Sequence, residues 1–386
     1  MKRLVAAAAL AAGSALAQQG EIAKWDPSMA AGAAVVTKGV KWIDGKSLPI
    51  EGRWTLGDAS HYYSRLPDTL TTNVNAGVRG ARLHTSGMLF RFRTDSDFLV
   101  IRHKPLKGWH AMGHMTEVGV SGWDVYRLDR SSGSWRFVAS SHGASADRGN
   151  PGARIKRIDW HAGDECIVNL PLYNGVKEFS LGIAPGAKIE APSPWASGVA
   201  KPVVFYGTSI THGGCSSRPG LGFVNIVGRD LQVPVYGLGF SGSGVMEFEL
   251  SDVIARIDAS CYVLDCLWNM GMSNAPDVRS RRGRNVDENY ERFIRNLRAK
   301  RPGVPIVMAE RCDVYCRPQN SQDKFIRRLY EKLLAEGWKD LVYLPKDEMF
   351  TGDMEGTVDG CHPNDLGMMS MSKAFGKAVR KALGLK

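Results

Sequence analysis

The sequence predicts an all-β domain followed by a three-layer α/β domain built on a parallel sheet. In the first half, short alternating apolar runs are separated by turn residues, a pattern typical of a β-sandwich or jelly roll. Beyond about residue 195, apolar strands alternate with helical segments, which favours a parallel sheet covered by helices on both faces. We therefore expect a β-sandwich domain over residues 18–195 and an α/β domain over residues 196–386.

Residues 1–17 have the features of a secretory signal peptide. Lys2 and Arg3 precede an apolar stretch over residues 4–12, and Ala15-Leu16-Ala17 forms a small-residue cleavage site. The apolar stretch is too short to cross a bilayer, and no later segment approaches the roughly 18 apolar residues that a spanning helix needs. We expect the mature protein to be exported, to the periplasm or the medium, without membrane insertion.

Composition is typical of a folded globular protein, because 44% of the 386 residues are hydrophobic and 23% are charged. The formal net charge is +11, and the basic residues are scattered apart from a cluster over residues 279–284. A nucleic-acid-binding surface would combine basic residues with stacking aromatic side chains, and the sequence has no such array. The cluster is interpreted either as a solvated loop or as a site for anionic groups on a glycan.

The chain has seven cysteines, an odd number that leaves at least one unpaired if all disulfides are internal. Cys312 and Cys316 are near enough in sequence to pair, although spacing does not determine connectivity. No second pair of ligands has zinc-finger spacing. His110 and His114 would have ligand spacing only on a helix, and they lie among predicted strands and turns. We therefore expect no metal site.

The predicted elements follow in chain order. In the β half, strands are expected at residues 88–93, 98–102, 124–128, 135–138 and 178–183. Residues 185–198 contain three prolines and are interpreted as a linker. In the second half, strands are expected at residues 202–206, 233–238, 261–267, 305–309 and 341–344, with helices at 286–300, 321–335 and 366–383. Asn285 and Glu288 predict a capping-box start for the first of these helices.

A serine and an acid–base pair at the two ends of the second half predict nucleophilic chemistry. Ser209 directly follows the apolar strand over residues 202–206, and ligands of α/β sheets bind at the carboxyl ends of strands. Asp359 and His362 lie three residues apart near the end of the chain. A serine hydroxyl becomes a good nucleophile when an imidazole removes its proton, and that imidazole needs an oriented acceptor. The pattern predicts a hydrolase. The structural alternatives are that Ser209 is an ordinary turn residue and that His362 is a histidine of the core.

Four sequence blocks resemble the SGNH/GDSL hydrolases. They are the serine block over residues 207–211, the glycine block ending at Gly242, the block Leu267-Trp268-Asn269-Met270, which lacks the usual Gly-x-Asn-Asp flanks, and Asp359-x-x-His362. The string over residues 214–220, together with residues 264–267, looks like the exported branch that carries an N-terminal β-domain. Gly122-Trp123-Asp124-Val125-Tyr126 resembles the Gly-x-Asp-Leu-Tyr signature of that domain, with Val in place of Leu.

The resemblance implies a flavodoxin-like parallel sheet and hydrolysis of acyl esters, most often acetyl esters of carbohydrate, without a cofactor. Ser209 would be the nucleophile, His362 the base and Asp359 its orienting acid. The Ser209 and Gly242 backbone N–H groups and the Asn269 amide would form the oxyanion hole. The function alternatives are a silent glycan-binding protein on the same scaffold, and a short-chain lipase or thioesterase. The partner expected is an O-acylated carbohydrate, with no nucleic acid.

Several neighbouring residues have two interpretations. His212, three residues after the serine, is a rival base or a wall of the pocket, on the expectation that a helix follows the serine. Asp353 and Asp365 are alternatives to Asp359, and Asn269 may simply cap its strand. Candidate substrate-binding residues are His212, Arg218, Trp268 and Met270, although Trp268, Met270 and Met272 would serve equally well as core. Asp265 is expected to be structural.

Asp124 and Tyr126 share one predicted strand and therefore one face of its sheet. A buried aspartate there would need a partner, and Arg218 is the candidate because arginine pairs with carboxylates. We therefore predict that the β-domain docks near the loops that carry the active site.

Overall fold

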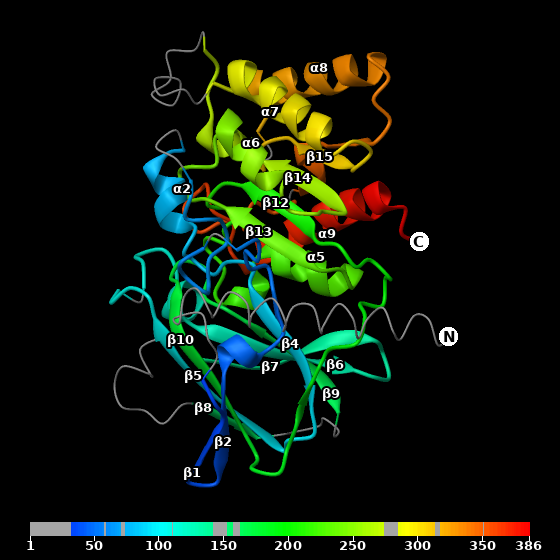
Figure 1. Cartoon of the computed structure of the whole chain (residues 1–386). Helices are drawn as coiled ribbons and strands as arrows, with labels where there is room; N and C mark the ends of the chain where they lie inside the picture. Colours follow the sequence, from blue (N-terminus) through cyan, green and yellow to red (C-terminus); the bar gives the residue numbers. More distant parts are fainter. Residues whose placement is uncertain are drawn as a thin grey trace.

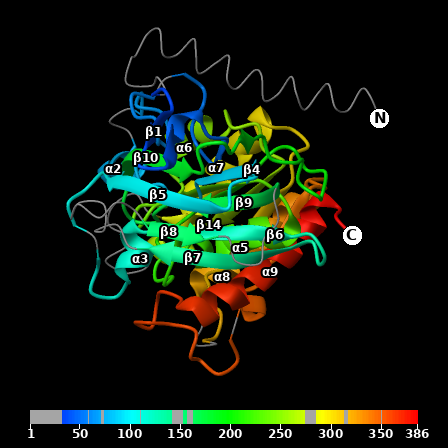
Figure 2. The ribbon, with the colours of Figure 1, turned by 90° about the horizontal axis from the view of Figure 1, so that it is seen from below.

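The computed structural model describes residues 32–57, 59–70, 74–109, 111–141, 153–156, 163–273, 285–312, 317–349 and 351–386. Two antiparallel sheets form the N-terminal half (Figures 1 and 2). One sheet has the order β1-β2-β10-β5-β8, with bounds Val35–Thr37, Val40–Asp44, Val176–Ile183, Phe98–Pro105 and Ala153–Lys156. The other has the order β11-β4-β9-β6-β7, with bounds Ile189–Glu190, Leu89–Thr94, Asp164–Asn169, Trp123–Asp129 and Ser134–Ser141. The short strand β3 (Ile50–Glu51) also pairs with β4.

The core of the sandwich is made by alternate residues of both sheets. Phe90 and Phe92 of β4 point inward to the same cluster as Leu99 and Ile101 of β5, and all four are at most 2% exposed. Period-2 alternation places such residues on one face of each strand, and this is the pattern from which the strands were predicted. The all-β prediction is therefore confirmed.

The C-terminal half contains a parallel five-stranded sheet of order β13-β12-β14-β15-β16, the flavodoxin-like order that was expected. The strands are Val235–Gly239, Val203–Gly207, Cys261–Asp265, Ile306–Ala309 and Leu341–Leu344. Val203 and Phe205 of β12, an interior strand, pack beneath α5 and α9, whereas Val204 and Tyr206 pack against the helices of the opposite face. The three-layer prediction is confirmed, and Figure 1 shows these layers above the sandwich.

Helices α5 (Phe223–Leu231) and α9 (Asp365–Leu383) cover the face of the sheet nearer the sandwich, and α6 (Phe248–Ile254), α7 (Val286–Lys300) and α8 (Ser321–Ala335) cover the other (Figure 1). Short helices α2 (Ala76–Ala81) and α3 (Glu117–Ser121) belong to the N-terminal half, and 3-10 turns lie at Gly45–Ser47, Pro219–Leu221, Leu267–Asn269 and Lys346–Met349. None of the helices in the described part of the chain has the length and apolar character that crossing a bilayer requires.

Helix capping differs from the prediction in one detail. Asn285 is the N-cap residue of α7, but its side chain makes no capping hydrogen bond. A capping box instead starts α8, where Asn320 and Asp323 bond to each other's backbone N–H groups. The motif in the sequence therefore located the start of α7 without identifying the bonds that stabilise it.

Three other local predictions need correction. The segment over residues 185–198 is packed rather than a simple linker, because β11 pairs with β4 and Trp195 is only 7% exposed. The strand expected over residues 261–267 ends at Asp265 and is followed by a 3-10 turn. No helix directly follows Ser209, because residues 209–215 form successive turns and α5 begins only at Phe223.

Several predictions concern residues outside the described part of the chain. They are the signal peptide over residues 1–17, His110, the basic cluster over residues 279–284, and the pairing partner Cys316.

Candidate active site

Ser209, His362 and Asp359 lie together at the carboxyl edge of the parallel sheet. The His362 Nε2 atom is 2.9 Å from the Ser209 Oγ atom, and the His362 Nδ1 atom is 2.7 Å from the Asp359 Oδ2 atom. The two hydrogen bonds connect hydroxyl, imidazole and carboxylate in series, although 153 residues separate the serine from the histidine. This is the arrangement in which an imidazole can accept a serine proton while an aspartate holds its tautomer.

The loop that carries the acid and the base is a tight local structure. The Asp359 Oδ1 atom accepts hydrogen bonds from the backbone N–H groups of Cys361 and His362, at 3.0 and 2.7 Å. Aspartate commonly bonds the backbone a few residues ahead in this way. Gly360 adopts a φ of 81°, which a residue with a side chain rarely reaches. The Asp-Gly-Cys-His sequence therefore builds the acid–base pair from local bonds.

Burial of Asp359 opposes its ionisation, but the hydrogen bonds from His362 and Cys361 outweigh it. They lower the pKa of Asp359 to about 2. The carboxylate is therefore charged at neutral pH and can stabilise an imidazolium next to it. The alternative acids are engaged elsewhere: Asp365 accepts from the backbone N–H and hydroxyl of Ser217, and Asp353 accepts from the backbone N–H of Glu355.

Ser209 occupies the turn after β12, where it is 7% exposed. Its backbone carbonyl accepts hydrogen bonds from the N–H of Gly214 and from the hydroxyl of Tyr173, at 3.0 and 2.9 Å. Tyr173 follows β9 and belongs to the sandwich half. The β-domain therefore contacts the backbone of the candidate nucleophile directly, through a tyrosine that no sequence motif singled out.

Three donors of the predicted oxyanion hole lie around this serine's loop. Gly242 has a φ of 65° and an exposed backbone. In the part of the chain that the structure describes, neither its N–H nor that of Ser209 has a hydrogen-bond acceptor. The Asn269 side-chain oxygen accepts from the N–H groups of Ser243 and Gly244, at 3.0 and 3.2 Å, in the amide orientation that turns the oxygen towards these two donors. This orientation leaves the Asn269 NH₂ group available as a donor.

Two of the four candidate substrate-binding residues are completely buried, which corrects those predictions. His212 is 0% exposed, stacks on Tyr173 with ring centroids 4.2 Å apart, and bonds to His84 at 3.2 Å. Burial lowers the pKa of His212 well below its usual range, so the ring is neutral. Met270 is also 0% exposed and packs in the core beneath α7. Neither side chain can contact a substrate, because the opposing domain or core covers it.

The other two candidates remain partly accessible. Trp268 is half-buried, and its indole N–H donates to the carbonyl of Cys312 while Arg311 lies 4.7 Å from its ring centroid. The side chain of Arg218 is 18% exposed, but its guanidinium is engaged between the domains. The structure therefore gives Arg218 a structural partner in place of the expected substrate.

The predicted docking of the β-domain through Arg218 is confirmed. The Asp124 Oδ2 atom accepts hydrogen bonds from the Arg218 guanidinium and from the Gly220 N–H, each at 2.8 Å. Its Oδ1 atom accepts from Asn169 at 2.8 Å, and the Tyr126 hydroxyl also bonds to Arg218. Asp124 is 0% exposed. A buried carboxylate with this set of donors links β6 to the loop between Ser209 and α5.

Asp265, at the end of β14, is structural, as expected. Its Oδ2 atom accepts from the Thr211 hydroxyl at 2.8 Å, and burial raises its pKa to about 7. Because the folded pKa is above the ordinary value of about 3.9, this carboxyl destabilises the fold as pH rises from about 4 to 7. The full penalty, on the order of 4 kcal/mol, is present above pH 7.

Asp265→Asn is therefore expected to stabilise the protein in a pH-dependent way. The isosteric amide removes the ionisable group and keeps an acceptor for Thr211. The variant should unfold at a higher temperature than the wild type at pH 8, and the difference should shrink towards pH 4. Thermal unfolding of both proteins across this range measures it. An equal difference at pH 4 and pH 8 would show that the charge of Asp265 is not the cause.

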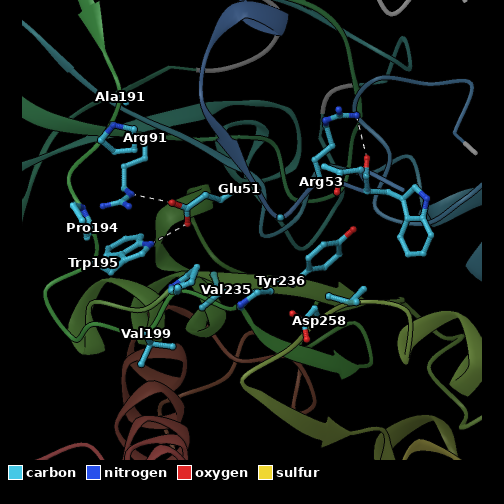
Figure 3. Close-up of a pocket in the computed structure, with 18 of the residues that line it drawn as sticks. Glu51, Arg53, Arg91, Ala191, Pro194, Trp195, Val199, Val235, Tyr236 and Asp258 are labelled. Carbon is cyan, nitrogen blue, oxygen red and sulfur yellow. Dashed lines mark hydrogen bonds and ion pairs between the residues drawn. The ribbon is translucent and has the colours of Figure 1, made fainter. Parts of the chain in front are cut away.

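A separate cavity of about 830 Å³ lies between the domains at the opposite, amino end of the parallel strands. The Glu51 carboxylate accepts hydrogen bonds from the Arg91 Nε atom at 2.9 Å and from the Trp195 indole nitrogen at 3.3 Å. Figure 3 marks both bonds with dashed lines. Burial raises the pKa of Glu51. The residues that line this cavity include none of Ser209, His362 and Asp359.

One residue at the site was recognised in the sequence only by its metal-like spacing. His114, from the loop between β5 and α3, has its ring centroid 5.5 Å from that of His362. It is exposed and comes from the sandwich half. No local pattern could place it there, because its position depends on how the two domains dock.

A parallel α/β sheet with a serine, an imidazole and a carboxylate bonded in series has the architecture of a serine hydrolase. Residues 200–380 match the GDSL-like lipase/acylhydrolase family, and residues 40–189 match the GxDLY family, the N-terminus of esterases of the SGNH hydrolase type. The chain belongs to the SGNH/GDSL hydrolases with a GxDLY N-terminal domain, and it is an esterase.

Solved structures agree with this assignment. A protein from Bacteroides ovatus described as a GDSL-like lipase is 26% identical, with a TM-score of 0.74 and coverage of 90% of this chain and 99% of that one. The salicylyl-acyltransferase SsfX3 of a tetracycline biosynthetic pathway is 18% identical (TM-score 0.69; 91% and 99% covered). A family two carbohydrate esterase from Cellvibrio japonicus is 12% identical (TM-score 0.52; 89% and 98% covered). The last two show likeness of fold. No curated protein sequence matches the chain.

Proposed function

We propose that the protein is an exported serine esterase that removes acetyl groups from carbohydrate. The observation that carries the proposal is an open Ser209–His362–Asp359 arrangement. The side chains of His362 and Asp359 are 21% and 36% exposed, so the acid and the base face solvent beside the serine. Export is supported by the signal-like sequence of residues 1–17.

In this mechanism Ser209 attacks the ester carbonyl while His362 accepts its proton. Asp359 keeps the imidazole in the required tautomer and stabilises the imidazolium that forms. The imidazolium then protonates the leaving sugar hydroxyl, and a water molecule attacks the acyl-enzyme with His362 again acting as base. The N–H groups of Ser209 and Gly242 and the Asn269 amide would donate to the oxyanion of each tetrahedral intermediate.

A carbohydrate substrate is supported by two further facts. A family two carbohydrate esterase from Clostridium thermocellum, similar in fold with a TM-score of 0.50, was solved in complex with cellohexaose. In addition, the sandwich contributes the exposed His114 beside His362. A polymeric alcohol would meet both halves of the protein at this rim.

Acetate release from a panel of acetylated glycans tests the proposal. Acetylated xylan, pectin, sialylated mucin and simple acetylated hexoses would be compared with aryl esters of increasing acyl length. We expect acetate from at least one glycan and a preference for short acyl groups. A clear preference for long acyl chains would refute the acetyl assignment, and failure to hydrolyse any ester would refute the enzymatic role.

Asn269→Asp is expected to separate the donor role of this side chain from its structural role. The carboxylate can still accept from the N–H groups of Ser243 and Gly244, but it has no NH₂ to donate to an oxyanion. Loss of one such donor should lower kcat by about 10²–10³-fold while KM changes little. Steady-state kinetics on an activated acetate ester, with thermal unfolding as the check on folding, measure this. Wild-type kcat in the folded variant would exclude Asn269 from the oxyanion hole.

A further inference from the structure

Three metal-ligating side chains meet at the active site from three separate segments. One potential ligand atom from each of His114, Cys215 and His362 lies within 4.8 Å of the other two. His114 comes from the sandwich, Cys215 from the loop between β12 and α5, and His362 from the loop before α9. The cluster therefore exists only when the two domains are docked.

Two of the three ligands have no competing hydrogen bond. Within the described residues, neither the imidazole of His114 nor the sulfur of Cys215 takes part in one, and the contact of His114 is with the ring of His362. Cys215 is 6% exposed. Zinc binds cysteine as the thiolate, so the thiol of Cys215 would lose its proton when the ion binds.

The dimensions suit a small tetrahedral ion. Zinc binds nitrogen at about 2.0–2.1 Å and thiolate sulfur at about 2.3 Å, so tetrahedral ligand atoms lie roughly 3.3–3.7 Å apart. The cluster must contract by roughly 1 Å to reach this geometry. His114 can supply that movement because its side chain is exposed and makes no hydrogen bond. A water molecule would complete the coordination.

We propose that His114, Cys215 and His362 form a zinc-binding site whose occupation inhibits the esterase. Binding replaces the thiol proton of Cys215, which passes to solvent, by a sulfur–zinc bond, and no electrons are transferred. Imidazole and thiolate ligands favour Zn²⁺ over Mg²⁺ and Ca²⁺. The zinc is a reversible inhibitor here and takes no part in the reaction.

Inhibition follows from the double use of His362, and this part of the inference rests on the proposed function. One ring nitrogen of His362 bonds to Ser209 and the other to Asp359. A zinc ion on either nitrogen therefore removes either the proton acceptor of Ser209 or the group that orients it. Partial occupancy of the site by zinc should lower the fraction of active enzyme, whereas the KM of the zinc-free molecules should not change.

Direct binding is measured on the full-length Ser209→Ala variant, which keeps all three ligands. Titration with Co²⁺, in a phosphine reductant that does not bind metal, should produce a thiolate-to-cobalt charge-transfer absorption with one ion per chain, and Zn²⁺ should abolish it. Cys215→Ser in the same background should lose the band, and His114→Ala should weaken Zn²⁺ affinity at least tenfold. No absorption band would overturn the proposal whatever the activity of the enzyme.

Inhibition is measured on otherwise wild-type protein, with each variant compared with its own metal-free rate. Micromolar Zn²⁺ should inhibit reversibly, Mg²⁺ should not, and a chelator should restore activity. His114→Ala and Cys215→Ser should each raise the inhibitory Zn²⁺ concentration at least tenfold. Cys361→Ser is the matched control, because this neighbouring cysteine lies outside the cluster. Relief of inhibition by Cys361→Ser, or unchanged inhibition in the other two variants, would overturn the assignment.

The two measurements separate this proposal from the proposed function. If Ser209→Ala retained full activity, the catalytic assignment would fail while the cobalt spectrum still reported the site. If Ser209→Ala were inactive but bound no Co²⁺ or Zn²⁺, only the metal site would fail.

Discussion

Replacing Ser209 with alanine is expected to lower kcat by about 10⁴–10⁶-fold with little effect on folding. The substitution removes the only atom that forms the acyl-enzyme bond in the proposed mechanism, whereas the oxyanion donors and the substrate site remain. Residues of a triad act as one unit, so His362→Ala should have a similar effect and the double variant should lose little more. Rates on an activated acetate ester, with thermal unfolding of each variant, measure this.

Ser216→Ala is the matched control for this experiment. Ser216 lies in the same loop region and is 0% exposed, and its hydroxyl is buried without a hydrogen-bond partner in the described part of the chain. Its removal should leave kcat within about twofold of the wild type, because the hydroxyl makes no hydrogen bond that the substitution could break.

The double variant tests whether Ser209 and His362 act together. Additive losses in the Ser209→Ala and His362→Ala double variant would contradict a shared proton-transfer step.

Arg218→Met is expected to destabilise the protein by about 3–5 kcal/mol. It leaves the Asp124 carboxylate, which is 0% exposed, without its cationic partner between the two domains. Removing one member of a buried ion pair is costly because the remaining charge stays desolvated. Chemical denaturation at neutral pH measures the change in the free energy of unfolding. Loss of this ion pair should also separate the unfolding transitions of the two domains, because the pair joins β6 to the loop beside Ser209.

Two comparisons make the interpretation specific. Asp124→Asn in the Arg218→Met background should recover part of the stability, because it removes the unpaired buried charge. The new amide oxygen can still accept a hydrogen bond from Asn169 or Gly220. Arg136→Met, which breaks the exposed pair with Asp129, should cost far less stability, because solvent screens that pair. Equal losses from Arg218→Met and Arg136→Met would show that the interdomain ion pair has no special role.

Removing the sandwich altogether gives the corresponding domain-level result. Deletion of residues 18–195 would uncover Arg218, His212 and the backbone of Ser209, which contact Asp124, His84 and Tyr173 of the sandwich. The remainder is expected to be insoluble or inactive. A soluble α/β half with full activity on small and polymeric esters would show that docking is dispensable.

The sequence alone determined the fold class and the chemistry-bearing residues of the site. Strand alternation and helical spacing are local properties, and they located β12 and α9 within one residue of each end. The spacing of Asp359 and His362 is equally local, because hydrogen bonds over three residues build that loop. Ser209 followed from the rule that chemistry lies beyond the carboxyl ends of parallel strands.

Only the tertiary structure decided what surrounds these residues. His212 and Met270 were expected at the substrate because they lie next to motif residues in sequence, yet both are fully buried. The partner of His212 is His84, 128 residues away, and the neighbour of His362 is His114 from the other domain. Burial and contacts of this kind depend on which distant surfaces pack together, and no local periodicity records that information. Domain docking therefore decided the surroundings of the active site, whereas local sequence decided its chemistry.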